Sequence, residues 1–183
     1  MYNINSTIFV DMDGVLVNFI QGCHEFLKKP WDSYRTKEQK DQRGKAVFES
    51  GPHFWENLPP MGDYQHLWSY IHPYNPKILT AYPSGHNKDC NLNEKSTEYA
   101  KVGKWEWCKK YLRIPYSNFH CIARQHKQEY ATRVYNGSIV SNILIDDTPE
   151  NIKEWINNRG HGILHKNSNE TILQLKQLGI IHA

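Results

Sequence analysis

Short apolar runs, separated by longer polar stretches, recur along the chain. The first run, at residues 8–10, has no alternation of apolar and polar positions, which is typical of a strand buried on both faces of a parallel sheet. It leads directly into a pair of aspartates and a glycine. Together the runs predict strands at residues 7–13, 77–81, 119–123, 142–147 and 161–165.

Between these runs, apolar residues recur at helical spacing. The first predicted helix begins at residue 15 and ends at residues 28–30. The others are expected at residues 36–50, 63–72, 97–112, 148–158 and 168–179. The remaining stretches are expected to be irregular at residues 52–62 and 82–96, with a short helix and then a loop at 124–140. Alternating strands and helices predict an α/β fold with a mostly parallel sheet, here a three-layer Rossmann-like core.

The mainly helical stretch between the first two strands is too long for a single crossover connection. We therefore expect a core formed by residues 1–16 and 73–183, with residues 17–72 inserted as a small helical cap. A length of 183 residues suits one domain with such an insertion.

Composition and charge limit the classes of function. No apolar run approaches the roughly 18–20 residues that cross a bilayer, so we expect no membrane partner. The four cysteines are scattered, which predicts reduced thiols and a cytoplasmic location. Since the chain soon enters its first strand, we also expect no signal peptide. A net charge of +3 is too small to attract a polyanion by bulk field, but it is compatible with a site for a small anion.

Two pairs of aspartates follow predicted strands. Asp11 and Asp13, with Gly14 after them, end the first strand, and Asp146 and Asp147 end the fourth. Ligands of open α/β sheets bind outside the carboxyl ends of the strands. Two acidic strand ends in one parallel sheet can therefore converge on one Mg²⁺ ion, which prefers carboxylates, water and phosphate oxygens.

Each pair also has a plainer interpretation. The first pair could belong to a solvated turn. It does not belong to a calcium-binding loop, because apolar residues stand where that loop would need its later ligands and Gly22 stands at the twelfth position. The second could serve only the helix that Pro149 opens, with Asp147 or Thr148 as its N-cap.

Other polar residues stand near the same predicted edge of the sheet. Thr80 lies near the end of the second strand, and Arg124 and Lys127 follow the third strand. Lys104 lies in the predicted helix that connects these two strands. A cation at a strand end could neutralise a phosphoryl group. Taken singly, Thr80 is an ordinary β-branched strand residue, and each lysine could lie on a solvated helix face.

Along the chain, Asp-x-Asp-Gly follows the first strand, Thr lies near the end of the second, Lys follows the third and Asp-Asp ends the fourth. This ordered set resembles the motifs of the haloacid dehalogenase (HAD) superfamily of Mg²⁺-dependent phosphohydrolases, and the resemblance extends over nearly the whole chain. Within it the sequence is similar to the 5'(3')-deoxyribonucleotidases. The similar segments are Asp-Met-Asp-Gly-Val-Leu at 11–16 with a following Phe, Val-Phe-Glu-Ser at 47–50, Phe-Trp-Glu-Asn-Leu-Pro-Pro at 54–60, Lys-Trp-Glu-Trp-Cys-Lys-Lys-Tyr at 104–111 and Ile-Asp-Asp-Thr-Pro at 145–149.

The resemblance implies catalytic roles. Asp11 would be the nucleophile that forms an aspartyl-phosphate, and Asp13 would be the general acid for the leaving group and then the base for water. The residues that would contact the phosphoryl group are Thr80, Lys104, Arg124 and Lys127.

The resemblance also implies a metal and a base site. The Mg²⁺ ligands would be Asp11, the backbone carbonyl of Asp13 and Asp147, with Asp146 beside them. Phe19 and Phe48 match aromatic residues of the cap that pack against the nucleobase. Because the cap begins directly after the first strand, we expect it to select the substrate.

The sequence departs from this family in three places. Ala81 stands where a serine often adds a phosphate contact, which Ser84 could supply. The spacing of 19 between Lys127 and Asp146 is longer than usual and indicates an insertion. The loop at 82–96 is also long and rich in asparagine. These departures concern how the leaving group is selected.

The expected function is Mg²⁺-dependent hydrolysis of nucleoside monophosphates, with a deoxyribonucleotide as the small-molecule partner. The alternatives are a phosphatase of another small metabolite such as a sugar phosphate, a nucleic-acid 3'-phosphatase, or a HAD-like module that binds a nucleotide or protein without catalysis. The intact aspartates argue against the last. No stable nucleic-acid partner is expected, and a homodimer is left open.

Overall fold

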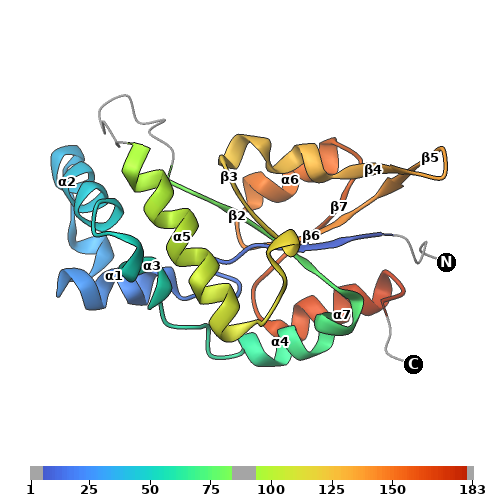
Figure 1. The fold of residues 1–183 in the computed structure, drawn as a ribbon, viewed down its shortest axis with the longest axis horizontal. Helices are drawn as coiled ribbons and strands as arrows, with labels where there is room; N and C mark the ends of the chain where they lie inside the picture. The colour runs from blue at the N-terminus through green and yellow to red at the C-terminus, as the bar shows by residue number, and fades with distance from the viewer. Residues whose placement is uncertain (1–5, 84–93, 181–183) are drawn as a thin grey trace.

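The computed structural model describes residues 6–83 and 94–180, and its centre is one parallel sheet (Figure 1). The strand order is β3-β2-β1-β6-β7. Every neighbouring pair in this sheet is parallel, so the predicted α/β class with a mostly parallel sheet is confirmed. The strands are β1 (Ile8–Val10), β2 (Lys77–Ala81), β3 (Phe119–Ile122), β6 (Ile143–Asp146) and β7 (His161–Leu164).

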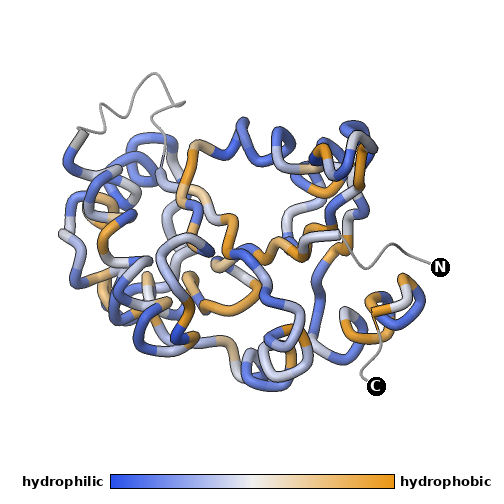
Figure 2. Tube along the Cα trace, turned by 45° about the vertical axis from the view of Figure 1, so that its right-hand side comes forward, coloured by the Kyte–Doolittle hydropathy of each residue, from blue (hydrophilic) through white to orange (hydrophobic). Residues whose placement is uncertain are grey.

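Helices cover both faces of this sheet and complete three layers. One face packs against α4 (Tyr64–Ile71), α5 (Glu94–Tyr111) and α7 (Ser168–Gln177). The other packs against α6 (Pro149–Asn157) and the 3₁₀ segment η4 (Arg124–Tyr130). Within β1, Ile8 and Val10 belong to the first core and Phe9 to the second. The central strands are accordingly apolar (Figure 2).

A second group of helices lies beside the carboxyl end of β1 (Figure 1). It contains α1 (Phe19–Leu27), η1 (Trp31–Ser33), α2 (Lys37–Phe48) and α3 (Pro52–Glu56). Helix α3 packs closely on α5, because a Cβ atom on Gly103 would lie 2.2 Å from the carbonyl oxygen of Pro52. The Trp107 indole nitrogen also donates to the carbonyl of Leu58 at 2.9 Å.

The predicted cap at 17–72 therefore contains helices with different neighbours. Helix α4 lies beside α7, where the Ser168 backbone donates to an Asp63 carboxylate oxygen at 2.7 Å. The 3₁₀ turns η2 (His72–Tyr74) and η3 (Tyr116–Asn118) precede β2 and β3. The division into a core and a cap stays a prediction.

The first helix begins later than the apolar spacing indicated. The amides of Leu16 and Val17 both donate to the carbonyl of Met12, at 2.8 Å, which makes residues 12–17 a tight turn. The side chain of Asn18 then caps α1. The turn also ends β1 at Val10, so the expected strand at 7–13 is shortened.

The expectation of an irregular segment at 52–62 is wrong for its first part, where Pro52 occupies the first turn of α3. Proline lacks the amide hydrogen that an interior helix position would need, but the first turn has no use for it. Helix α5 begins at Glu94, three residues before the expected start. The rest of the loop expected at 82–96, including Ser84, lies largely outside the described residues.

The loop expected around Asn136 and Gly137 is a β-hairpin. Strands β4 (Thr132–Tyr135) and β5 (Ser138–Ser141) pair antiparallel. The two linking residues have φ of 48° and 75°. Such a two-residue turn favours the Asn-Gly sequence. This hairpin accounts for the long spacing between Lys127 and Asp146.

Within 6–83 and 94–180, no helix combines the length and apolar character that crossing a bilayer requires.

Candidate active site

A cavity of about 530 Å³ opens at the carboxyl ends of β1, β2, β3 and β6. Its position agrees with the general rule for open α/β sheets. Its lining contains both charged and apolar residues. The lining residues are Asp11, Asp13, Gly14, Asn18, Phe19, Ile20, Met61, Ala81, Arg124, Lys127, Asp147, Thr148 and Asn151.

Asp11 follows β1 directly and is 6% exposed. Its backbone amide donates to the carbonyl of Ile145 at 2.9 Å, which ties this strand end to β6. One carboxylate oxygen accepts from the Met12 amide at 2.8 Å. The other lies 2.9 Å from the Lys127 ammonium. These contacts fix the direction of a nearly buried carboxylate.

Lys127 lies in η4 and connects two strand ends. Its ammonium lies 2.9 Å from Asp11 and 2.8 Å from Asp146. Burial disfavours a charged lysine, but the two carboxylates outweigh this effect, and the pKa of Lys127 is raised. Lys127 is therefore a permanent positive charge on the cavity wall, placed where a phosphoryl group could be neutralised.

Asp146 is fully buried, and both of its oxygens already accept hydrogen bonds. One accepts from the Thr148 amide at 2.9 Å, and the other accepts from Lys127 at 2.8 Å. The Asn151 amide group donates to both, at 3.0 and 2.9 Å. Burial and the Asp11 charge raise the pKa of Asp146 to about 6. Asp146 therefore acts as a partner of Lys127 and Asn151.

Asp147 is exposed, and its side chain passes over Gly14. A Cβ atom at Gly14 would lie only 1.9 Å from one Asp147 oxygen, so only glycine leaves room for this carboxylate. Gly14 also has φ of +77°, which glycine adopts without strain. Partial desolvation and the charge of Asp11 raise the pKa of Asp147.

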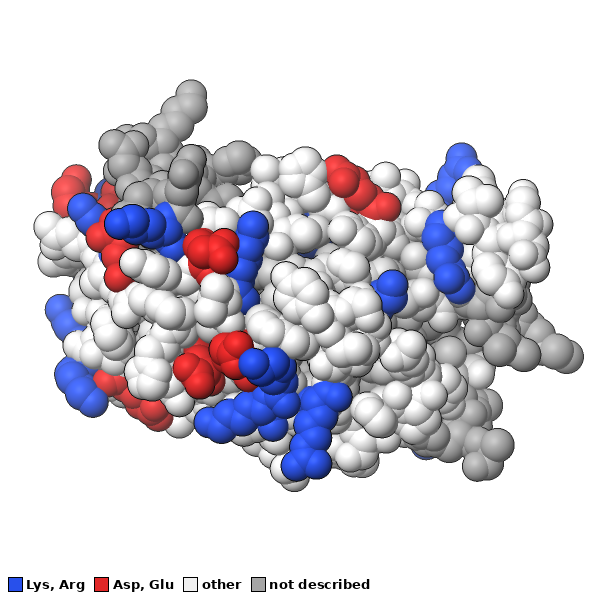
Figure 3. Space-filling view, viewed as in Figure 1, with Lys and Arg blue, Asp and Glu red and all other residues white. Residues whose placement is uncertain are grey.

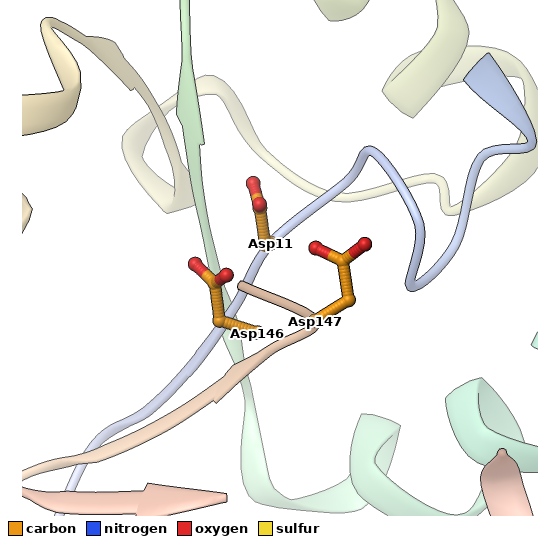
Figure 4. A group of neighbouring side chains, drawn as sticks. All are labelled: Asp11, Asp146 and Asp147. Atoms are coloured by element: carbon orange, nitrogen blue, oxygen red, sulfur yellow. The ribbon is translucent and has the colours of Figure 1, made fainter. Parts of the chain in front are cut away.

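The three carboxylates at the ends of β1 and β6 point to the same side (Figure 4). Asp11, Asp146 and Asp147 each offer one oxygen, and these oxygens lie within 4.8 Å of one another. Oxygen donors of this kind suit Mg²⁺. Asp11 and Asp147 line the cavity, whereas Asp146 is not among the described residues that do so, which makes Asp11 and Asp147 the better candidates for ligands. The residues present therefore fit a divalent cation.

Asp13 and Thr80 meet at Lys104. The Lys104 ammonium donates to Asp13 at 2.6 Å, to the Thr80 hydroxyl at 2.9 Å and to the Ala81 carbonyl at 2.8 Å. The Trp55 ring lies 5.2 Å from the same ammonium. The structure thus brings six sequence-predicted residues into two clusters: Asp11 and Asp146 contact Lys127, and Asp13 and Thr80 contact Lys104.

The remaining candidates are less closely grouped. Phe19 lines the cavity and stacks on Trp55 at a ring distance of 5.8 Å. Phe48 also stacks on Trp55, at 6.2 Å, but it is not among the described residues that line the cavity. Arg124 lines the cavity and pairs with Glu154 at 3.2 Å, so its guanidinium is shared.

Sequence reasoning missed Asn151, Ile20 and Met61. Asn151 had a usable signal, because it is the third residue of α6 after its Thr148 cap, a position from which a side chain can turn back to the residues before the helix. Ile20 and Met61 are single apolar residues that face the cavity, and nothing in their sequence context distinguishes them from core residues.

No protein-family model and no curated protein matches this sequence. Several solved structures are similar to it, including the following two. One is a hydrolase from Streptococcus pneumoniae TIGR4, with a TM-score of 0.41 and 11% identity, covering 96% of this chain and 98% of that chain. The other is the HAD domain of the effector protein Lem4 from Legionella pneumophila, with a TM-score of 0.40 and 10% identity, covering 94% of each chain. Likeness of this degree carries no information on activity.

Proposed function

We propose that the chain is a Mg²⁺-dependent phosphomonoesterase of the HAD type that works through an aspartyl-phosphate. The observation that carries the proposal is that Asp11, Asp13, Lys127 and Asp147 line one cavity. They come from three strand ends in the order on which the sequence resemblance rests. The fixed carboxylate of Asp11, with a lysine beside it, suits a nucleophile toward a phosphate ester.

In the first step, an Asp11 oxygen attacks the phosphorus and the bond from phosphorus to the leaving oxygen breaks. The electron pair of that bond stays on the leaving oxygen, which takes a proton from Asp13 and departs as an alcohol. Lys127 offsets the negative charge on the equatorial oxygens. The product is a phosphoryl group held on Asp11.

In the second step, water attacks the same phosphorus and gives a proton to Asp13. The bond from phosphorus to Asp11 breaks, its electron pair restores the carboxylate, and inorganic phosphate leaves. Asp13 ends the cycle protonated, as it began. The two aspartates therefore have different tasks although one residue separates them.

The residues proposed to hold Mg²⁺ are Asp11, Asp147 and the backbone carbonyl of Asp13, with Asp146 beside them. When bound, the ion would supply the positive charge that offsets repulsion between the Asp11 carboxylate and a dianionic phosphate. Asp146 keeps Lys127 in place through its ion pair at 2.8 Å.

We propose nucleoside monophosphates, and deoxyribonucleotides first, as substrates. The cavity volume of about 530 Å³ lies within the usual range for small-molecule sites. Phe19, Ile20 and Met61 offer an apolar wall for a base or sugar. On the left of the face seen in Figure 3, positive side chains stand among negative ones, and the net charge of +3 is small, which favours a small ester over a polyanion. A cytoplasmic setting is proposed with it.

The test is turnover of p-nitrophenyl phosphate by the purified chain, with Mg²⁺ and with EDTA, followed by a panel of phosphorylated metabolites that includes the common deoxyribonucleotides. Asp11→Asn should abolish turnover. Asp32→Asn, the same change at an exposed aspartate of η1, should leave it unchanged. Undiminished turnover in Asp11→Asn, or no turnover of any ester by the wild type, would refute the proposal.

A further inference from the structure

Lys104 is a buried cation whose hydrogen-bonding capacity is fully used inside the protein. It is 0% exposed. An ammonium has three donors and no acceptor. Its three acceptors are Asp13 at 2.6 Å, Thr80 at 2.9 Å and the Ala81 carbonyl at 2.8 Å. A phosphoryl oxygen could bind Lys104 only by displacing one of them.

Lys127 is in a different position. It contacts two carboxylates, at 2.9 and 2.8 Å, so these contacts account for two of its three donors. It also lines the cavity, whereas Lys104 is not among the described residues that do so. The two lysines are therefore not equivalent, and Lys127 is the one placed to meet a ligand.

The contact from Lys104 distinguishes the two oxygens of Asp13. Oδ2 accepts from Lys104 at 2.6 Å. Oδ1 is buried and has no hydrogen-bond partner among the described residues. Because Lys104 can only donate, a proton shared between Asp13 and a ligand must be carried by Oδ1. A buried acceptor without a partner is uncommon, and in a cavity it points to a ligand group.

We infer that Lys104 is a positioning residue that holds Asp13 by Oδ2 and leaves Oδ1 to exchange the proton with the leaving oxygen and then with water, and that Lys104 does not contact the phosphoryl group. The inference rests on the proposed function. It differs from the role in phosphate binding that the sequence resemblance implies for Lys104.

This inference predicts a dependence on the leaving group. Loss of Lys104 should impair proton donation by Asp13, which matters for a basic leaving group and little for one that departs without a proton. Phenyl phosphate and 2,4-dinitrophenyl phosphate form a suitable pair, because they have similar shapes and leaving groups of very different basicity. The value of kcat/KM is the appropriate measure, since it excludes the later hydrolysis of the phosphorylated enzyme.

The experiment compares Lys104→Met with Lys127→Met. Lys104→Met should lower kcat/KM by about 100-fold for phenyl phosphate and by less than about threefold for the dinitrophenyl ester. Lys127→Met should lower both by a similar factor, because it loses a contact to the phosphoryl group itself. Lys101→Met, the same change one turn earlier on α5, should match the wild type on both esters.

A second measurement determines the affinity for inorganic phosphate. It follows the rise in unfolding temperature as phosphate is added in the presence of Mg²⁺. Lys104→Met should bind phosphate within about twofold of the wild type, and Lys127→Met at least about tenfold more weakly, the loss expected for a charge-assisted hydrogen bond. Tenfold weaker binding in Lys104→Met, or equal losses on the two esters, would overturn the inference.

A substitute variant and the phosphate measurement keep the test conclusive if Lys104→Met does not fold or if the wild type is inactive. If Lys104→Met does not fold, Lys104→Gln keeps a donor of shorter reach, and the same two criteria apply to it. If the wild type hydrolyses no ester, the proposed function fails, and the phosphate measurement still decides whether Lys104 contacts phosphate. Failure of the inference alone would appear as an active wild type in which Lys104→Met behaves like Lys127→Met.

Discussion

Gly14→Ala tests whether the close approach of Asp147 to the turn after β1 builds the metal site. The new Cβ atom would lie 1.9 Å from one Asp147 oxygen and 2.5 Å from its carboxyl carbon. Neither distance is tolerable, so the Asp147 side chain must move away. Gly137→Ala is the matched control, because Gly137 has φ of +75°, close to the +77° of Gly14, with nothing within 4 Å of its Cβ position.

Both substitutions place alanine in the left-handed region, which costs roughly 1–2 kcal/mol of stability. The two variants should differ in their response to Mg²⁺. At a Mg²⁺ concentration of 100 times the wild-type Kd, bound metal stabilises the folded state by about 2.7 kcal/mol. If loss of Asp147 weakens binding about 100-fold, the gain at the same concentration falls to about 0.4 kcal/mol.

The assay is urea denaturation of the wild type and both variants, in EDTA and in Mg²⁺. In EDTA the two variants should be destabilised by similar amounts, because moving Asp147 breaks no ion pair among the described residues and costs at most the exposed 3.3 Å hydrogen bond from the Thr148 hydroxyl. Only Gly137→Ala should recover stability when Mg²⁺ is added. An equal gain from Mg²⁺ in Gly14→Ala would refute the assignment of Asp147 as a ligand.

Three further predictions follow from the contacts. Gly103→Ala should destabilise the protein by about 1–3 kcal/mol in urea denaturation, because its Cβ would meet α3 backbone at 2.2 Å; an unchanged midpoint would contradict this packing. The folded-state pKa of Asp146, about 6, lies above its ordinary value, so the native state binds the extra proton, and the contribution of Asp146 to metal-free stability should fall as pH rises from 4 to 6.5. Asp146→Asn should remove that part of the slope, and an unchanged slope would exclude Asp146 as its source. Phe19→Ala should lower nucleotide turnover about tenfold more than turnover of p-nitrophenyl phosphate, while Phe48→Ala should affect both alike; equal losses in Phe19→Ala would remove the base-stacking role.

The strand ends could be predicted from the sequence because burial on both faces leaves a plain apolar run. The run at 77–81 is β2 with the same bounds, and residues 143–146 of the expected 142–147 form β6. Given a parallel sheet, the polar residues after these runs must share one edge. The shared edge alone predicts that Asp11 and Asp147 lie near each other, without any knowledge of side-chain geometry.

The contacts of the two lysines could not be predicted in this way. A lysine on α5 gives no signal that its ammonium reaches Thr80 across the helix–sheet interface, because Lys104 stands among residues that also suit an exposed helix face. Likewise, nothing in the pair Asp146 and Asp147 says which carboxylate has its hydrogen-bond partners inside the protein. The hairpin at 132–141, by contrast, was signalled by Asn-Gly and could have been recognised.

The charges at the strand ends explain why two lysines are needed. Asp11, Asp146 and Asp147 carry three negative charges, and Lys127 offsets one, which leaves an excess of two that a divalent cation can balance. Asp13 does not add to this excess, because Lys104 pairs with it separately at 2.6 Å. The site thus separates into an anionic part suited to a metal and a separate pair, Asp13 with Lys104, that lies apart from that excess charge.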